Sequence, residues 1–173
     1  EVVKRKDVHV QPFEKVLEVK KKEEGFEVHT NKGSYSSPIV VMATGYYDQP
    51  NMLNVPGEEL PHVFHYFKEG HPYFDCDVTV IGGKNSSVDA ALELVKAGAR
   101  VTVLYRGSEY SKSVKPWILP EFDALVQKGI IQMEFNAAVD RITEKQIIYT
   151  VSGEGQKVKD ADFVFAMIGY HPD

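Results

Sequence analysis

The feature that most constrains this sequence is an ordered unit of a buried strand, a glycine-rich turn, an amphipathic helix and a second buried strand, all within about 30 residues. The strands are expected at 78–81 and 101–104, where near-continuous apolar runs fit parallel strands covered on both faces. The helix between them ends at Gly98, and its apolar face consists of Val88, Ala91, Leu92 and Val95. Strands joined in this way are expected to be parallel, with a right-handed crossover. The unit therefore predicts an α/β fold built on a parallel sheet.

The remainder of the second half extends this pattern. A second helix is predicted over 118–128 and a third strand over 130–135. Short alternating segments between 139 and 158 predict an antiparallel β excursion, and 163–168 predicts a last buried strand. The expected fold class is a Rossmann-like NAD(P)-binding domain, a βαβ core with an antiparallel excursion, preceded by a β-rich segment of another domain.

The first third of the chain carries the β-rich segment. Strands separated by tight turns are expected at 16–19 and 26–30, and a buried strand at 39–42 leads into Ala43-Thr44-Gly45. Prolines and glycine then predict a linker. The predicted organisation is a β-rich domain segment over 1–50, the linker over 51–61, a nucleotide-binding domain over 62–165 and a return segment over 166–173.

Composition excludes several function classes. The formal charge of −5, without a dense basic cluster, argues against nucleic acid or a membrane as partner. No apolar run approaches the roughly 18 residues that span a bilayer, and the cytoplasm is the expected location. The single cysteine, Cys76, excludes an intrachain disulfide, and His65 and His71 lack the third ligand that a metal site needs. A start at Glu1, with neither an initiator Met nor a leader, indicates a piece of a longer protein.

The turn Gly82-Gly83-Lys84-Asn85-Ser86-Ser87 predicts a site for a pyrophosphate. Backbone N–H groups and the positive end of the helix dipole converge where a strand passes into a helix through such a turn. Gly82 fills the first glycine position of the dinucleotide-binding pattern, whereas Lys84 stands where the second glycine is expected. Ser86 is expected to cap the helix, with Asp89 as the acid of a capping box. The alternative is that the two glycines merely turn the chain.

The end of the second strand favours NADPH over NADH. An NAD enzyme carries a carboxylate there for the adenosine ribose, and this sequence has Tyr105-Arg106 instead. Arg106 offers a planar, permanently charged partner for a 2′-phosphate, and Lys112 and Lys115 follow on the same loop. The two lysines fit an ordinary solvated loop equally well. Tyr105 either stacks on the adenine or caps the sheet.

Further segments give the chain a resemblance to a known family. Val40 to Gly45 resembles the A-T-G segment of flavoproteins that bind both FAD and NAD(P), and Phe165 to Pro172 resembles the segment that returns the chain to the FAD domain. With Val80 to Ala91, Val103 to Gly107 and Lys115 to Pro120, the chain is similar to thioredoxin-reductase-like pyridine nucleotide-disulfide oxidoreductases, and most of all to the bacillithiol-disulfide reductase type.

This resemblance implies an enzyme with NADPH and FAD as cofactors and with a small-molecule disulfide as the final electron acceptor. It places near FAD the residues Ala43, Thr44 and Gly45, and near the nicotinamide the residues Ile168, Gly169 and Tyr170. Because the two cofactors carry the redox chemistry, no residue of this chain is expected to be a catalytic acid or base. The resemblance also implies a homo-oligomer.

The sequence departs from the family pattern in two ways. No C-x-x-C pair is present, and Cys76 alone cannot form one. The amino-terminal turn that binds the FAD pyrophosphate in the family is absent from this sequence. Two other function classes therefore stay open, a flavoprotein monooxygenase that passes electrons to oxygen and a non-catalytic NADPH-binding module.

Overall fold

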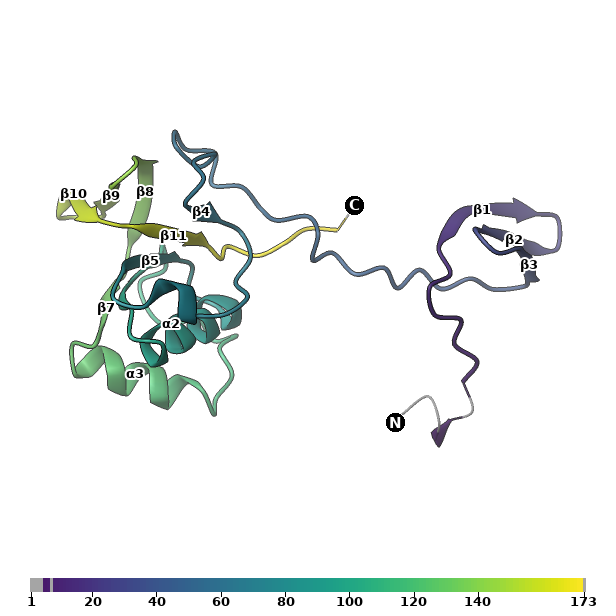
Figure 1. Ribbon diagram of the computed structural model, residues 1–173, viewed down its shortest axis with the longest axis horizontal. Helices are drawn as coiled ribbons and strands as arrows, with labels where there is room; N and C mark the ends of the chain where they lie inside the picture. Colours follow the sequence, from purple (N-terminus) through teal and green to yellow (C-terminus); the bar gives the residue numbers. More distant parts are fainter. Residues whose placement is uncertain (1–4, 7, 173) are drawn as a thin grey trace. The chain divides into compact units, whose positions relative to one another are not determined.

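The computed structural model describes residues 5, 6 and 8–172. The chain divides into two compact units, Glu1–Gly45 and Tyr46–Asp173. Each unit has its own sheet or sheets (Figure 1). The fold class is the predicted one, a parallel α/β core with an antiparallel excursion and a separate β-rich segment.

The first unit is an antiparallel meander. Its strands pair in the order β1-β2-β3, with the bounds Val16–Lys22, Gly25–Thr30 and Ser34–Ser37. Gly25, at a φ of +95°, starts β2 directly after the turn that joins it to β1. The Glu14 carboxylate accepts hydrogen bonds from the hydroxyls of Thr30 at 2.6 Å and Tyr35 at 2.7 Å. These bonds stabilise the ionised carboxylate and lower the pKa of Glu14.

The buried strand predicted at 39–42 is wrong for this structure. No strand is assigned between Ile39 and Gly45, and the side chains of Ile39, Val41 and Met42 are 73%, 80% and 70% exposed. The segment is apolar, but a strand needs a neighbouring strand to accept and donate its backbone hydrogen bonds. None of the described strands pairs with this segment, and its apolar side chains Ile39, Val41 and Met42 are exposed.

The second unit is organised by a five-stranded parallel sheet. The strand order is β4-β11-β5-β6-β7, and the bounds are Val63–Phe64, Phe163–Ala166, Asp77–Ile81, Arg100–Leu104 and Ile131–Glu134. Every pairing in this sheet is parallel. The predicted strands are confirmed. The strand β4 was not predicted, because a two-residue strand has no detectable periodicity.

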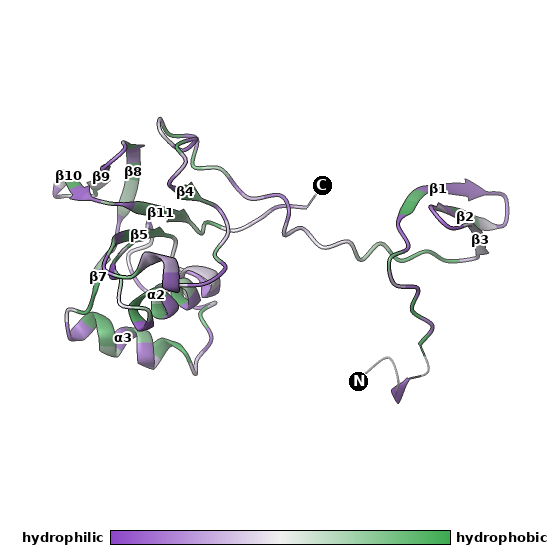
Figure 2. Cartoon of the chain, viewed as in Figure 1, coloured by the Kyte–Doolittle hydropathy of each residue, from purple (hydrophilic) through white to green (hydrophobic). Residues whose placement is uncertain are grey.

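Helices cover one face of the parallel sheet. They are α2 (Asn85–Lys96) and α3 (Leu119–Gln127), and a short 3-10 helix, η1 (His71–Tyr73), precedes β5. The core between helices and sheet contains Val80, Val103, Phe122 and Phe165, all at most 1% exposed. Figure 2 shows β11 as hydrophobic along its length, while α3 alternates between hydrophobic and hydrophilic residues. This difference is expected, since the strand is covered on both faces and the helix on one.

The antiparallel excursion covers the opposite face. Its strands pair in the order β10-β9-β8, with the bounds Gly155–Asp160, Gln146–Val151 and Ala137–Ile142. Ile147 and Tyr149 pack with Ile81 and Leu104 of the parallel sheet in a second core. At the rim, the Lys157 ammonium lies 3.1 Å from the Glu134 carboxylate. The unit therefore has three layers, helices, parallel sheet and antiparallel sheet.

The segment at 51–61, predicted as a linker, packs onto the second unit. Leu53, Val55 and Leu60 contact the second core. Glu58 is 7% exposed, and its carboxylate accepts the backbone N–H groups of Leu53 at 2.6 Å and Asn54 at 2.7 Å. The division between the units falls earlier in the chain, after Gly45. The prolines of this segment thus belong to compact turns, which share their composition with linkers.

Gly57 provides a test of this packing. Its φ is +89°, and an added Cβ would lie 1.9 Å from the carbonyl oxygen of Ile142. We expect Gly57→Ala to lower the free energy of unfolding by about 3–5 kcal/mol, from both the backbone conformation and the clash. Gly153→Ala is the matched control, because its φ is +87° but nothing lies within 4 Å. Denaturant unfolding that gave equal losses for both variants would contradict the packing.

Candidate functional site

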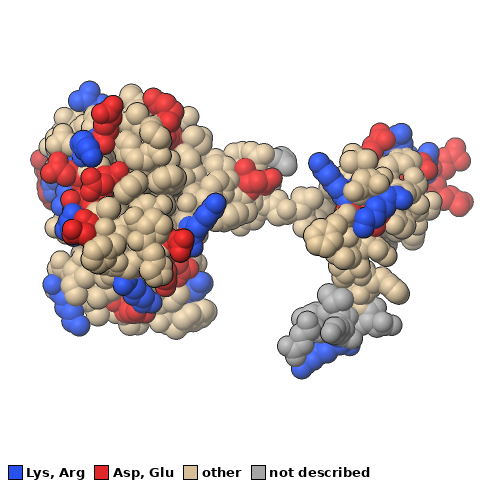
Figure 3. All heavy atoms as spheres, viewed as in Figure 1, with Lys and Arg blue, Asp and Glu red and all other residues tan. Residues whose placement is uncertain are grey.

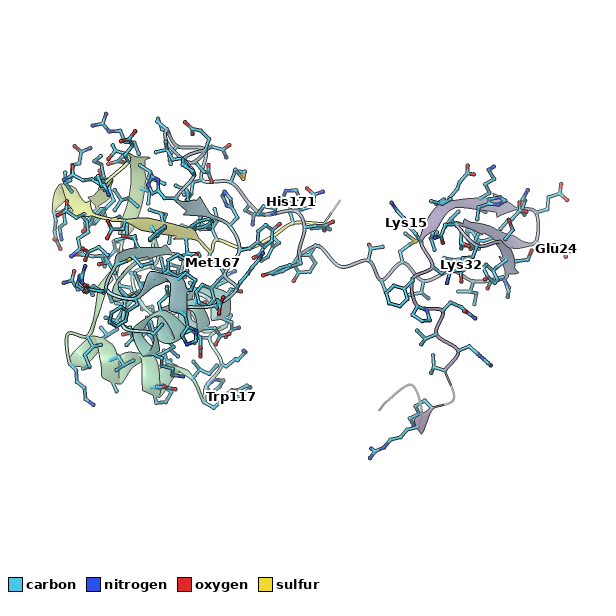
Figure 4. All side chains as sticks on the ribbon, in the orientation of Figure 1. Lys15, Glu24, Lys32, Trp117, Met167 and His171 are labelled. Atoms are coloured by element: carbon cyan, nitrogen blue, oxygen red, sulfur yellow. The ribbon has the colours of Figure 1, made fainter. Side chains whose placement is uncertain are left out.

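The carboxyl ends of three adjacent strands meet at one edge of the parallel sheet. β11 leads to Met167, β5 leads to Gly82 and β6 leads to Tyr105. Met167 lies directly after β11 in Figure 4. Since β5 has β11 on one side and β6 on the other, the chain order reverses here. In open parallel sheets, ligands bind outside the carboxyl ends of the strands at such a switch point.

Gly82 is required by the close approach of two backbones at this edge. Its φ is +138°, a conformation that residues with a side chain rarely adopt. An added Cβ would lie 2.4 Å from the carbonyl oxygen of Met167, and the Gly82 N–H donates to the carbonyl of Leu104 at 2.9 Å. The glycine therefore holds the turn against the strand ends on both sides.

The helix after the turn begins earlier than predicted. The N-cap is Lys84 and not Ser86, and no side chain caps the helix. The capping box is wrong, because the Ser87 hydroxyl donates to the Lys84 carbonyl at 2.8 Å and Asp89 forms an ion pair with Lys115. Within residues 8–172, the backbone N–H groups of Asn85, Ser86 and Ser87 have no hydrogen-bond acceptor.

Three unpaired N–H groups at a helix N-terminus attract an anion. They carry the positive end of the helix dipole and can donate to phosphate oxygens. The Lys84 side chain is exposed at the same place and has no ion-pair partner among the residues that the structure describes. The local geometry therefore suits a pyrophosphate even though the second glycine of the pattern is a lysine.

Tyr105 packs on the glycine turn. An added Cβ on Gly83 would lie 2.4 Å from the Tyr105 ring, and one on Gly107 would also lie 2.4 Å from it. The backbone of Tyr105 is bonded to the neighbouring strands, since its N–H donates to the backbone carbonyl of Glu134 at 2.9 Å and its carbonyl accepts from the N–H of Ala137 at 3.0 Å. Of the two roles considered for this ring, the contacts favour packing at the sheet end.

The three predicted cations of the following loop differ in their surroundings. Arg106 and Lys112 are exposed and make no ion pair within the described part of the chain. The Lys115 ammonium lies 3.2 Å from the Asp89 carboxylate, so its charge is already balanced within the protein. Over the visible face of the second unit, basic and acidic side chains are interspersed (Figure 3). An anion at this edge would therefore be bound by individual cations such as Arg106 and Lys112, since the visible face has no broad basic patch.

The loop that carries these cations is attached at several points. The Tyr110 hydroxyl donates to the Asp123 carboxylate at 2.9 Å, and burial together with this bond raises the pKa of Tyr110 to about 12. The Val114 side chain lies in the core between helices and sheet. The side-chain amide of Asn85 bonds to two backbone groups of the loop. The loop is thus attached to α3, to the core and to the start of α2.

The return segment lies beside the chain that enters the second unit. The Asn51 N–H donates to the carbonyl of Gly169 at 3.0 Å, and Pro50 and Tyr170 form an antiparallel bridge. The Tyr170 ring lies 4.5 Å from that of Tyr47 and 5.7 Å from that of Tyr66, between centroids. Burial raises the pKa of Tyr170 well above its usual value. Ile168 packs on the second core.

Most of the predicted site residues share this edge. The turn at 82–87, Tyr105, Arg106 and the loop to Lys115 are joined by direct contacts, and Met167 connects them to the return segment 168–170. Ala43, Thr44 and Gly45 belong to the first unit, where they are exposed.

Sequence reasoning missed three contributors to the edge. Gly107 accommodates the Tyr105 ring, Asp89 pairs with Lys115, and Asn51 binds the return segment. Only Gly107 has a local signal, a glycine two residues after a strand end.

Among the described residues, no three His, Cys, Asp or Glu side chains come together in a way that could hold a metal ion. No helix there has both the length and the apolar character needed to cross a membrane.

Comparison with known proteins identifies the class. The family model described as pyridine nucleotide-disulphide oxidoreductase matches residues 1–173, and the chain belongs to this family. The chain is 67% identical over 149 residues to bacilliredoxin reductase Bdr of Bacillus subtilis, covering 86% of this chain and 46% of that protein.

Solved structures agree with this assignment. Bacillithiol disulfide reductase Bdr (YpdA) from Staphylococcus aureus matches with a TM-score of 0.87 and 60% identity over 99% of this chain and 53% of that one. The enzyme of the same name from Bacillus cereus matches with a TM-score of 0.86 and 64% identity over 99% and 54%. The chain spans about half the length of these relatives, and the resemblance inferred from the motifs is confirmed.

The contact between Gly83 and Tyr105 yields a prediction for the site. Gly83→Ala places a Cβ on the ring, and we expect a loss of about 1–3 kcal/mol in the free energy of unfolding. Tyr105→Ala removes the ring, so the same glycine substitution in that background should cost much less. A double-mutant cycle by denaturant unfolding measures the difference. Additive losses would show that the ring does not pack on the turn.

Proposed function

We propose that this chain is the NADPH-binding part of a flavoprotein disulfide reductase. In the proposed reaction, hydride passes from NADPH to FAD and electrons pass on to a low-molecular-weight disulfide, with bacillithiol disulfide as the substrate. The observation that carries the proposal is the uncapped start of α2 behind Gly82, next to a strand end that bears Arg106 and no carboxylate. The names of the most similar relatives support the choice of substrate.

The residues of the second unit fit an NADPH molecule. The N–H groups of Asn85, Ser86 and Ser87 would bind the pyrophosphate, and the buried glycines at 82 and 83 leave room for it. Arg106 and Lys112 would bind the 2′-phosphate as exposed cations without partners in the described chain. The segment 168–170, which continues from β11 at the same edge, would lie on the nicotinamide side. NADPH supplies the hydride, and these residues bind and orient it.

The FAD side of the proposal rests on the first unit. Ala43, Thr44 and Gly45 would approach FAD, as the resemblance implies. Cys76 has no second cysteine in the sequence, and its thiol donates to the Phe74 carbonyl at 3.4 Å. Electrons would therefore leave the flavin without a dithiol of this chain. The cytoplasmic location and the homo-oligomer expected for this class are part of the same proposal.

The cofactor assignment is tested by nucleotide binding. Calorimetric titration of the chain at fixed ionic strength should show tighter binding of NADPH than of NADH. Arg106→Ala should weaken NADPH binding by about tenfold or more and leave NADH binding unchanged, because a charge-assisted bond to the 2′-phosphate is lost. Arg141→Ala, which removes an exposed arginine from β8, is the matched control. Equal affinities for the two nucleotides in wild type would overturn the assignment.

The electron acceptor is tested in the full-length flavoprotein. NADPH oxidation that depends on bacillithiol disulfide supports the proposed reaction. Rapid oxidation with oxygen and an organic substrate, and none with disulfides, would instead indicate a monooxygenase. A full-length protein that binds NADPH without flavin absorbance would be a non-catalytic module.

A further inference from the structure

We propose that the side chain of Asn85 is a latch that positions the 2′-phosphate loop, residues 106–118, against the pyrophosphate turn. Asn85 is thus a positioning residue for nucleotide selectivity, and its amide is not itself a phosphate ligand. The proposal rests on the proposed function, because the loop is argued to bind the 2′-phosphate of NADPH.

Both ends of the side-chain amide of Asn85 are hydrogen-bonded to the loop. Its Nδ2 group donates to the carbonyl of Ser113 at 2.8 Å, and its Oδ1 atom accepts the backbone N–H of Lys115, also at 2.8 Å. One bond is donated by the amide and the other is accepted by it, both at ordinary hydrogen-bond lengths, and together they define the orientation of the amide. Since Asn85 is the first residue of α2, these bonds join the loop to the same helical turn whose N–H groups face the predicted pyrophosphate.

The remaining attachments of the loop lie elsewhere. Tyr105 packs on Gly83 at its beginning, and the Tyr110 hydroxyl bonds to Asp123 of α3. Val114 inserts into the core between helices and sheet. Only the bonds of Asn85 and the ion pair of Lys115 with Asp89 join the loop to α2 through polar side chains, within the residues described.

The ion pair also changes which cations are available to the ligand. The Lys115 ammonium is 3.2 Å from Asp89, one turn along α2 from Asn85. It therefore contributes to holding the loop. Arg106 and Lys112, both exposed and without an ion pair in the described chain, are left to face the 2′-phosphate. The latch determines where these two charges stand relative to the N–H groups of α2.

A positioning role for Asn85 predicts a different effect on nucleotide binding from two simpler roles. A direct pyrophosphate ligand, or a residue that only stabilises the fold, affects NADPH and NADH alike, because both nucleotides share the pyrophosphate and the same folded protein. A latch for the 2′-phosphate loop mainly affects NADPH. Its effect must also act through Arg106 and Lys112 and must disappear when both cations are absent.

The experiment is a double-mutant cycle on selectivity. We would titrate the 173-residue chain with NADPH and with NADH by calorimetry, in wild type, Asn85→Ala, the cation variant Arg106→Ala/Lys112→Ala and the variant that combines all three substitutions. The Asn85→Ala substitution is expected to reduce the ratio of NADPH to NADH affinity by about tenfold. The combined variant should have the same ratio as the cation variant Arg106→Ala/Lys112→Ala. Thermal unfolding of each variant verifies that the chain is folded during the titration.

Two further variants keep the test decisive. Asn85→Ser, which retains a small polar residue in the first helical turn but cannot reach both loop groups, replaces Asn85→Ala if the latter does not fold. Gln156→Ala is the matched control, since it removes an exposed amide whose bond reaches Asp140, on the antiparallel excursion. The ratio for this control should equal that of wild type.

The possible outcomes separate the inference from the proposed function. If wild type prefers NADPH and the Asn85 variants keep the full preference, the latch is refuted while the NADPH assignment stands. Losses from the Asn85 substitution and from removal of the two cations that add independently also refute the latch. If wild type shows no preference for NADPH, the proposed function fails and the latch fails with it.

Discussion

The pairing of β11 with β5 is the constraint on which the candidate site depends. Phe163–Ala166 lies parallel to Val78–Ile81, with Ala166 opposite Ile81, although these strands are separated by most of the second unit. This register puts the carbonyl oxygen of Met167 2.4 Å from the position that a Cβ on Gly82 would take, and so joins the return segment to the glycine turn. Because parallel strands end at the same edge, a single pairing brings three chain segments together.

The two covering layers make that pairing stable. α2 and α3 bury one face of the sheet, and the antiparallel strands β8 to β10 bury the other. Removing apolar surface from water on both faces favours the near-continuous hydrophobic strands seen at β5, β6 and β11. Neither layer covers the edge that carries the turn and the loop. The uncapped start of α2, the exposed cations and the two buried glycines lie at this edge.

The sequence predicted which elements form this edge better than it predicted their hydrogen-bonding, ion-pair and packing partners. The glycine turn between β5 and α2 lies where it was expected, although α2 already begins at Asn85, and Arg106 follows the end of β6 as expected. Each of these predictions depends on residues close together in the chain. The helix cap was assigned to Ser86 with Asp89, yet Asp89 pairs with Lys115, 26 residues away. The strand predicted at 39–42 has the right composition but no neighbouring strand within the described chain. The prolines at 51–61 indicated a linker, but the apolar residues between them pack on the second core.

The sequence by itself determined the order of strands and helices, the glycine turn and the preference for a family that uses two dinucleotides. Hydrophobic periodicity and glycine conformations are local properties, and a single chain displays them directly. The tertiary structure alone decided that Asn85 bonds to Ser113 and Lys115, that Lys115 is neutralised by Asp89 and that Tyr105 packs between two glycines. These contacts depend on the strand register and on the path of a loop, and side-chain partners about 30 residues apart leave no periodic pattern in the sequence.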